Sequence, residues 1–454
     1  MYARHSRFLC VFFSVFIWSI GILTPAFAGK PTPPPPPPPP PPSGTTTLIS
    51  IAPAGSPGNS GSYGPSMSAD VRYVAFGSDA SDLVAGDSNN RTDVFVRDRP
   101  SGGTERVSVA NDGTQGDNHS YIGALGHSIS ADGRYVVFAS YANNLVSGPQ
   151  HFYSHVYVHD RIAHATERVS VATDGTAGDS YSYSPAISAD GRYVVFWSYA
   201  SNLVAADTNA VTDVFVRDLL AGTTERVSLA NGGAQGDKDS RGGVLSGDGR
   251  YVAFISDATN LVSGDTNAAS DVFVYDRVTQ IVERVSISSG GAQGNSWSGI
   301  PSISTDGRFV AFSSEAGNLV TGDTNGYHDV FVRDRIAGTT ERVSVASSGA
   351  QGDYESYLGA ISADGRFVGF ISYAANLVSG DTNYWGDSFI RDRLNGVTER
   401  ISLATDGTQG DSDSQYPIPS ADGQFVVFDS FASNFATGDT NGQSDVFMRE
   451  RSSP

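Results

Sequence analysis

A nine-residue phrase, SADGRYVVF or a near variant, recurs seven times along this chain and constrains its fold more than any other feature. The last phenylalanine of the phrase stands at Phe76, Phe138, Phe196, Phe254, Phe312, Phe370 and Phe428, so the copies are 62 residues apart once and 58 residues apart five times. A fixed period of this kind indicates a repeat architecture, in which each copy buries its apolar face only against its neighbours.

A single repeat, residues 283–341, predicts four short strands and no helix. The extended runs ERVSIS, IPSIS, RFVAFSS and DVFVRDR are separated by the polar segments SSGGAQGNSWSG, TDG and EAGNLVTGDTNGYH. In the TDG turn Gly307 can adopt the positive φ that such a turn needs. Four-stranded antiparallel units repeated four to eight times form a β-propeller. The sequence therefore predicts an all-β, seven-bladed propeller, and an open solenoid of the same repeats is the alternative.

The two ends of the repeat region predict how the ring closes. The chain finishes on the strand DVFMRER, residues 445–451, without the TERVS strand that follows in the other six repeats. A matching extended run, TLISIA, occurs at residues 47–52 instead. We therefore expect this N-terminal strand to complete the seventh blade, which removes an open sheet edge.

The phrase SADGRYVVF, followed by DVFVRDR and TERVS, resembles the repeat of TolB-type propellers, which are relatives of the WD-type propellers. The resemblance covers residues 48–454 and implies the propeller fold. TolB carries an additional α/β domain before its propeller, where this chain has a proline-rich segment, so the resemblance does not imply the partners of the Tol system. Peptidases and polysaccharide lyases use related propellers, but the sequence shows no counterpart of their catalytic parts.

The segments before the repeats predict where the protein works. Residues 1–28 have the pattern of a signal peptide, with a basic start, an apolar run and an A-x-A cleavage site ending at Ala28; an uncleaved membrane anchor is the alternative. Residues 29–47 contain ten consecutive prolines and predict a stiff linker. We expect a periplasmic or extracellular protein, without a transmembrane segment in the mature chain, whose propeller is residues 48–454. Its one cysteine, Cys10, lies in the leader, so no disulfide is expected.

The chain is acidic, with 48 Asp and Glu against 29 Lys and Arg, which makes it a poor partner for nucleic acid. The expected strand order places the GAQGD and GDTN loops on one face, the top face, and the DG turns, RDR ends and TER segments on the bottom face. Acids and arginines nearly balance on the bottom face, where we expect an ion-pair ring. On the top face Arg91, Lys238 and Arg241 are the only basic residues among many acids. We therefore expect the top face to bind a cation or a protein partner, and the protein to be a monomer.

Six top-face loops share the pattern Asp-x-Asn-x-x-x-Asp. Calcium takes six to eight oxygen ligands from carboxylates, amides, carbonyls and water, so these loops are candidate calcium sites. The alternative is turn chemistry, in which Asp and Asn bond their own backbone. The candidate ligands are Asp87, Asn89 and Asp93; Asp207, Asn209 and Asp213; Asp265, Asn267 and Asp271; Asp323, Asn325 and Asp329; Asp381, Asn383 and Asp387; and Asp439, Asn441 and Asp445.

The second repeat departs from this pattern. Pro149, His151 and His155 stand where the other repeats have Asp, Asn and Asp, and His119, His127, His159 and His164 lie in the same repeat. Neutral imidazoles suit zinc or copper, and they can also sense pH. Drift in one repeat that has lost its acidic loop is the alternative.

The sequence contains no nucleophile elbow, HExxH pair or phosphate-binding loop. It therefore favours a non-catalytic binding or scaffold module whose acidic face binds calcium and a protein partner. A first alternative is a hydrolase or lyase acting on carbohydrate or peptide in the top-face funnel, with stacking by Trp297, Tyr354, Tyr357, Tyr384 and Trp385. A second alternative is a purely structural repeat protein whose charge serves solubility.

Overall fold

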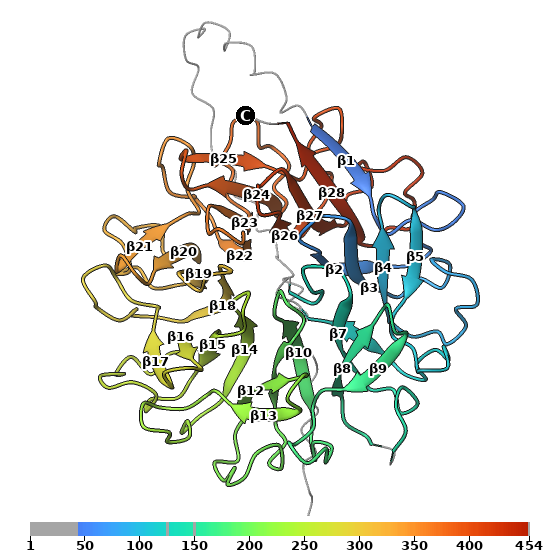
Figure 1. Cartoon of the computed structure of the whole chain (residues 1–454). Coiled ribbons are helices and arrows are strands. Elements are labelled where there is room, and N and C mark those ends of the chain that lie inside the picture. Colours follow the sequence, from blue (N-terminus) through green and yellow to red (C-terminus); the bar gives the residue numbers. More distant parts are fainter. Residues whose placement is uncertain (1–43, 124–126, 149–150, 453–454) are drawn as a thin grey trace, which may run out of the picture. The chain divides into compact units, whose positions relative to one another are not determined.

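A computed structural model describes residues 44–123, 127–148 and 151–452, and in them the repeats form a seven-bladed β-propeller (Figure 1). Every blade is a four-stranded antiparallel sheet, and the described residues form strands and turns without any helix. The predicted fold class is confirmed. The predicted signal peptide and most of the predicted linker lie outside the described residues. Within the described ranges, no helix is long and apolar enough to cross a membrane.

Each blade runs outward in chain order from its innermost strand. The strands of blade 1 are β2 (Ser62–Met67), β3 (Tyr73–Ser78), β4 (Asp93–Asp98) and β5 (Gly103–Arg106), and those of blade 2 are β6 (Ser120–Ile122), β7 (Tyr135–Ser140), β8 (His155–Asp160) and β9 (Ala165–Arg168). Blade 3 has β10 (Ser182–Ile187), β11 (Tyr193–Ser198), β12 (Asp213–Asp218) and β13 (Thr223–Arg226), and blade 4 has β14 (Ser240–Leu245), β15 (Tyr251–Ser256), β16 (Asp271–Asp276) and β17 (Ile281–Arg284). Blade 5 has β18 (Ser298–Ile303), β19 (Phe309–Ser314), β20 (Asp329–Asp334) and β21 (Thr339–Arg342). Blade 6 has β22 (Ser356–Ile361), β23 (Phe367–Ser372), β24 (Asp387–Asp392) and β25 (Val397–Arg400), and blade 7 has β26 (Ser414–Pro419), β27 (Phe425–Ser430), β28 (Asp445–Arg451) and β1 (Gly44–Leu48).

The N-terminal strand closes the ring as predicted, but with different bounds. β1 pairs antiparallel with β28, with Gly44 opposite Arg451 and Leu48 opposite Phe447; the two strands are blue and red in Figure 1. The strand was expected over residues 47–52, so it begins earlier, within the proline-rich segment, and ends earlier. It ends at Leu48 because the chain then bends into a turn, in which Ala52 N–H donates to the Ser56 carbonyl.

The hydrophobic core is divided among the interfaces between neighbouring blades. Between blades 4 and 5, Val272 and Val274 of β16 belong to one buried cluster with Phe312 and Phe331. The phenylalanine of the repeated phrase stacks on an aromatic ring of the next strand in every blade, with ring centroids 5.5–6.0 Å apart. A further cluster joins blades 7 and 1, so the ring is closed by side-chain packing as well as by β1.

The DG turn has the conformation that the sequence predicted. Gly307 has a φ of 72°, and a Cβ at this position would lie 2.2 Å from Cδ2 of Tyr251 in the preceding blade. The turn therefore needs glycine both for its backbone conformation and for the close approach of two blades.

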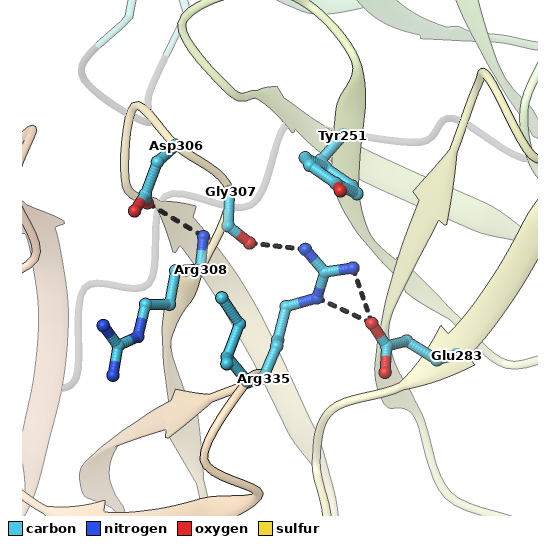
Figure 2. A pocket seen from close by; sticks show the side chains of 7 residues that line it. Tyr251, Glu283, Asp306, Gly307, Arg308 and Arg335 are labelled. Carbon is cyan, nitrogen blue, oxygen red and sulfur yellow. Dashed lines mark hydrogen bonds and ion pairs between the residues drawn. The ribbon is translucent and has the colours of Figure 1, made fainter.

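The bottom face carries the predicted ion-pair network. In six blades the arginine of the DGR turn, or of the DVR turn of blade 1, binds an aspartate of the third strand. Arg308, for example, donates from Nε to Asp334 Oδ1 at 3.0 Å and from Nη2 to Oδ2 at 2.7 Å. A second set joins neighbouring blades. Arg335 of blade 5 binds Glu283 of blade 4, donates to the Gly307 carbonyl and lies 4.4 Å above the Tyr251 ring (Figure 2).

The same residues line a shallow pocket of about 140 Å³. This volume is below the range of typical ligand sites, and the arginine and glutamate side chains in it bind one another (Figure 2). We therefore assign the pocket a structural role in holding the blades together.

One buried carboxylate lies at the seam between blades 7 and 1. Asp429 of β27 accepts hydrogen bonds from Gly64 N–H at 3.3 Å and from the Ser444 hydroxyl at 3.2 Å. Burial raises the pKa of Asp429 to about 7, whereas an unfolded chain gives aspartate a pKa of about 3.9. The folded protein thus holds a proton here that the unfolded chain has already lost, and the free energy of unfolding falls as pH rises from about 4 to about 7.

Replacing Asp429 by Asn should remove this part of the pH dependence, because the amide stays neutral and keeps the same size. Relative to the parent, Asp429→Asn should gain about 2–3 kcal/mol between pH 5 and pH 8, measured by urea unfolding at both pH values. Parallel pH profiles in the two proteins would contradict the assignment.

Candidate functional site on the top face

The Asp-x-Asn-x-x-x-Asp loops join the second and third strands of their blades, and their asparagines act within the turn. In blade 5, Asn325 Nδ2 donates to Asp329 Oδ2 and to the Gly352 carbonyl, both at 3.0 Å, while Asn325 Oδ1 accepts from Tyr327 N–H at 3.2 Å. The asparagines of the other five loops make the same pair of Nδ2 bonds. The amide is therefore engaged in the turn chemistry that was the alternative to metal binding.

In five of the six loops both aspartates bind an arginine of the same blade. Nη1 of Arg342, the last residue of β21, lies 3.1 Å from Asp323 Oδ1 and 3.1 Å from Asp329 Oδ2. The corresponding distances in the other four loops are 3.0–3.4 Å, and the side chains are at most 11% exposed. These four arginines are Arg106 with Asp87 and Asp93, Arg226 with Asp207 and Asp213, Arg284 with Asp265 and Asp271, and Arg400 with Asp381 and Asp387.

The arginines of the TER segments therefore lie at the opposite end of the blade from the one expected. We had placed the whole segment on the bottom face, and its glutamates do lie there, as Glu283 does beside Arg335. The outer strand is only four residues long and runs from bottom to top, so its last residue reaches the top-face loops. The top face consequently carries less net negative charge than the sequence indicated.

The sixth loop, in blade 7, has no arginine of this kind. Leu48 of β1 takes the register position opposite Phe447 that Arg342 takes opposite Phe331. Asp445 Oδ1 accepts from the Ser50 hydroxyl at 2.6 Å, as the corresponding aspartate does from Ser344 in blade 5.

Blade 2 keeps the arginine and lacks the acids. The rings of His151 and His155 lie together, with centroids 4.9 Å apart, and burial, with Arg168 and His151 adding to it, lowers the pKa of His155 to about 3. His119 bonds the Thr92 hydroxyl of blade 1 and His159 bonds Thr166, so the predicted histidines do not gather into one group. Over the described ranges, no three His, Cys, Asp or Glu side chains are placed to hold a metal ion.

A second candidate site occupies the top ends of the two innermost strands of the blades, which we call the inner rim. The rim side chains are Tyr63 and Asp79 in blade 1; His119, Tyr121 and Tyr141 in blade 2; Tyr181, Tyr183 and Tyr199 in blade 3; Asp239, Arg241 and Asp257 in blade 4; Trp297 and Glu315 in blade 5; Glu355, Tyr357 and Tyr373 in blade 6; and Asp413, Gln415 and Phe431 in blade 7. Sequence reasoning did not predict this site, although it had named four of its residues, His119, Arg241, Trp297 and Tyr357, for other reasons or as stacking residues. The signal was available, because the seven copies differ from one another at these positions while agreeing along the strands.

Aromatic rings of neighbouring blades meet on the rim. Tyr181 and Tyr183 stack with centroids 5.9 Å apart, and the hydroxyl of Tyr183 lies 3.0 Å from that of Tyr141 in blade 2. In blade 6, the rim residue Tyr373 packs against Tyr354 of the loop that precedes β22, and their ring centroids are 6.5 Å apart. Burial, together with Asp413 and Glu355, raises the pKa of Tyr373 to about 12, so its phenol stays neutral and can donate a hydrogen bond at neutral pH.

Carboxylates stand between these rings. His328 Nε2 lies 2.9 Å from Glu315, and the Tyr357 hydroxyl donates to Glu355 at 2.7 Å. Two of the predicted stacking residues, Tyr384 and Trp385, are exposed in the blade 6 loop that joins β23 to β24 and do not belong to the strand ends of the rim.

No family model matches this chain, and no curated protein matches it. Solved structures do: an oligogalacturonate lyase in complex with manganese is similar with a TM-score of 0.52 at 11% identity, over 90% of this chain and 96% of that chain. The propeller domain of the trilobed protease from Pyrococcus furiosus gives a TM-score of 0.51 at 10% identity, over 87% of this chain and 98% of that domain, and is described as having an open velcro topology. Another similar structure is a putative TolB from Agrobacterium tumefaciens, with a TM-score of 0.37 at 16% identity, over 62% of this chain and 80% of that chain.

These likenesses concern the fold. The chain is a seven-bladed β-propeller, the fold that the resemblance to TolB-type repeats implied, and TolB structures are among those to which it is similar. Its relatives in fold include both enzymes and TolB. Unlike the protease domain described as open, this propeller is closed by β1.

Removing one arginine of the loops should destabilise the fold strongly, because two buried carboxylates lose their counter-charge. Arg342→Met should cost about 3–5 kcal/mol in the free energy of unfolding, measured by urea unfolding at pH 7. Arg308→Met is the comparison: that arginine is 40% exposed on the bottom face and serves one carboxylate, Asp334, instead of two, so its loss should cost less, about 1–2 kcal/mol. Equal losses in the two variants would show that the buried ion pairs contribute no more to the free energy of unfolding than the half-exposed pair does.

The calcium hypothesis stays a prediction. In five loops a calcium ion would have to displace the arginine guanidinium group that now binds the two aspartates. If the loops bind calcium, Asp323→Ala with Asp329→Ala should lower calcium uptake by one ion per chain in equilibrium dialysis. Unchanged uptake would contradict the calcium hypothesis and leave Arg342 as the partner of these two carboxylates.

Proposed function

We propose that this chain is a non-catalytic binding module whose inner rim binds a basic segment of a protein partner. The observation that carries the proposal is the composition of the rim, which combines aromatic rings with six carboxylates and in which Arg241 is the only Arg or Lys. Arg241 is itself paired with Asp257 at 2.9 Å. The six carboxylates are Asp79, Asp239, Asp257, Glu315, Glu355 and Asp413.

The chemistry of the rim suits lysine and arginine side chains. Carboxylates attract such cations over long range and orient them, and an aromatic face adds a cation–π contact when the cation lies within about 6 Å of the ring. Exposed rings are present for this purpose, including Tyr199, Tyr373 and Phe431. Because each rim residue stands at the end of a paired strand, the surface is ordered before the partner arrives, which lowers the entropy cost of binding.

The proposed location is the periplasm or the medium, which rests on the signal-peptide pattern of residues 1–28. Calcium belongs to the proposal only as a possible further ligand of the top-face loops.

A second candidate function is a hydrolase or lyase acting on carbohydrate. Stacked tyrosines such as Tyr181 and Tyr183 favour it, since sugar rings also pack on aromatic faces. Turnover of an oligogalacturonate or other glycan by the purified protein would replace the binding proposal.

The rim proposal predicts which tyrosines matter. A fluorescent decapeptide of alternating Lys and Ser should bind at low salt, and Tyr199→Ala with Tyr373→Ala should weaken binding about tenfold or more by fluorescence anisotropy, a loss of about 1.4 kcal/mol. Tyr384→Ala is the control, because that ring is 91% exposed and lies outside the rim. A peptide of alternating Glu and Ser should not bind. An equal loss in Tyr384→Ala, or no binding of the basic peptide, would refute the proposal.

A further inference from the structure

The top-face loop of blade 7 retains both aspartates of its five counterparts but has lost their arginine. Leu48 stands opposite Phe447 at the register position of Arg342 and Arg400. In the part of the chain that the structure describes, no ion pair reaches Asp439 or Asp445. The blade 7 pair is therefore chemically different from the other five.

The two carboxylates are buried, and one of their oxygens has no partner. Asp439 is 8% exposed, and its Oδ1 has no hydrogen-bond partner among the described residues. This is the atom that pairs with arginine Nη1, at 3.0–3.4 Å, in blades 1, 3, 4, 5 and 6. Asp445 is fully buried, and its Oδ2 receives only Asn441 Nδ2 at 3.4 Å.

The surroundings add acceptors and negative charge. Burial, with Asp439 and Asp82 adding to it, raises the pKa of Asp445 to about 7. Burial also raises the pKa of Asp439, and Asp411 adds to that effect. In blades 4 and 6 a glycine carbonyl also accepts from the arginine, at 3.4 Å, and Gly438 is the equivalent residue here. The oxygens around this position thus need N–H donors.

We propose that the Asp439–Asp445 pair of blade 7 binds a guanidinium group that the fold does not supply itself, either the arginine side chain of a peptide or a free small guanidinium compound. The same oxygens hold a guanidinium in five other blades, and a planar group with several N–H donors can serve two carboxylates at once. Calcium is less well served, because it takes six to eight oxygens and, among the residues that the structure describes, no third acidic side chain joins the pair. The site lies beside the outermost strand, so it does not depend on the inner rim or on the function proposed for it.

The first experiment titrates the purified protein with guanidinium chloride at millimolar concentrations, far below those that denature proteins, against sodium chloride at equal ionic strength. A cation that binds only the folded state raises the melting temperature in a saturable way. We expect this rise in the parent protein and its absence in Leu48→Arg, which should itself melt at a higher temperature because it restores the internal guanidinium. Arg342→Leu creates a second blade 7-like pair and should show a larger rise from a lower starting temperature.

The second experiment identifies the source of the guanidinium. The peptide acetyl-Gly-Arg-Gly-amide is compared by calorimetry with its citrulline and lysine counterparts and with argininamide. Peptide binding at least about tenfold tighter than argininamide binding would identify an arginine side chain, and equal affinities would identify a free compound. The neutral citrulline peptide should not bind in either case.

Leu48→Arg and Asp439→Asn provide two independent checks of the site. Asp439→Asn keeps the size of the side chain, so it should fold and weaken binding about tenfold even if Leu48→Arg packs poorly. No response to guanidinium in the parent and in Arg342→Leu would show that protons alone neutralise the pair and would overturn the proposal. A saturable response to calcium in its place would overturn it in favour of a metal site, and a full response in Asp439→Asn would place the binding elsewhere.

Discussion

Packing between neighbouring blades is the interaction on which the rest of this structure depends. The valines and phenylalanines on the faces of a blade are covered by the neighbouring blades. Val272 of blade 4, for example, belongs to one buried cluster with Phe312 of blade 5. No blade can therefore bury its core alone. The ring must therefore close, and here it closes by joining β1 to β28. Closure fixes the top ends of all strands in one ordered surface without a disulfide.

Buried charge follows from the same architecture. The loops that connect the second and third strands turn two carboxylates inward, and a buried carboxylate is costly unless it is paired. The fold meets this need with an arginine from its own outer strand, as Arg342 does for Asp323 and Asp329. A motif that looks like a cation-binding loop in sequence thus has its cation built into the repeat.

Much of the fold could be predicted from the sequence, because the repeat encodes it several times over. The strand order and the DG turn at Gly307 followed from the repeated phrase, and the closing strand followed from the run missing at the other end of the chain, although its bounds did not. The role of Arg342 could not be predicted, because it depends on a strand being four residues long, so that its last residue reaches the top-face loops, and on the alternation that points the side chains of Glu341 and Arg342 to opposite faces of the sheet. The inner rim escaped notice for another reason: residues such as Tyr199 and Asp413 form no motif, and their meaning appears only when strand ends from different blades are brought together.

The two blades that break the repeat do so in opposite ways, and this contrast is informative. Blade 2 keeps Arg168 but has Pro149 and His155 in the sequence positions of the two acids and His151 in that of the asparagine. The lowered pKa values of His151 and His155 keep both imidazoles neutral beside the guanidinium. Blade 7 keeps Asp439 and Asp445 but has Leu48 in place of the arginine. The first change removes the counter-charges of this arginine and puts neutral imidazoles, which do not repel it, in its neighbourhood. The second leaves a buried carboxylate oxygen without a donor, an arrangement that is stable only if a proton or an external cation supplies what the repeat has lost.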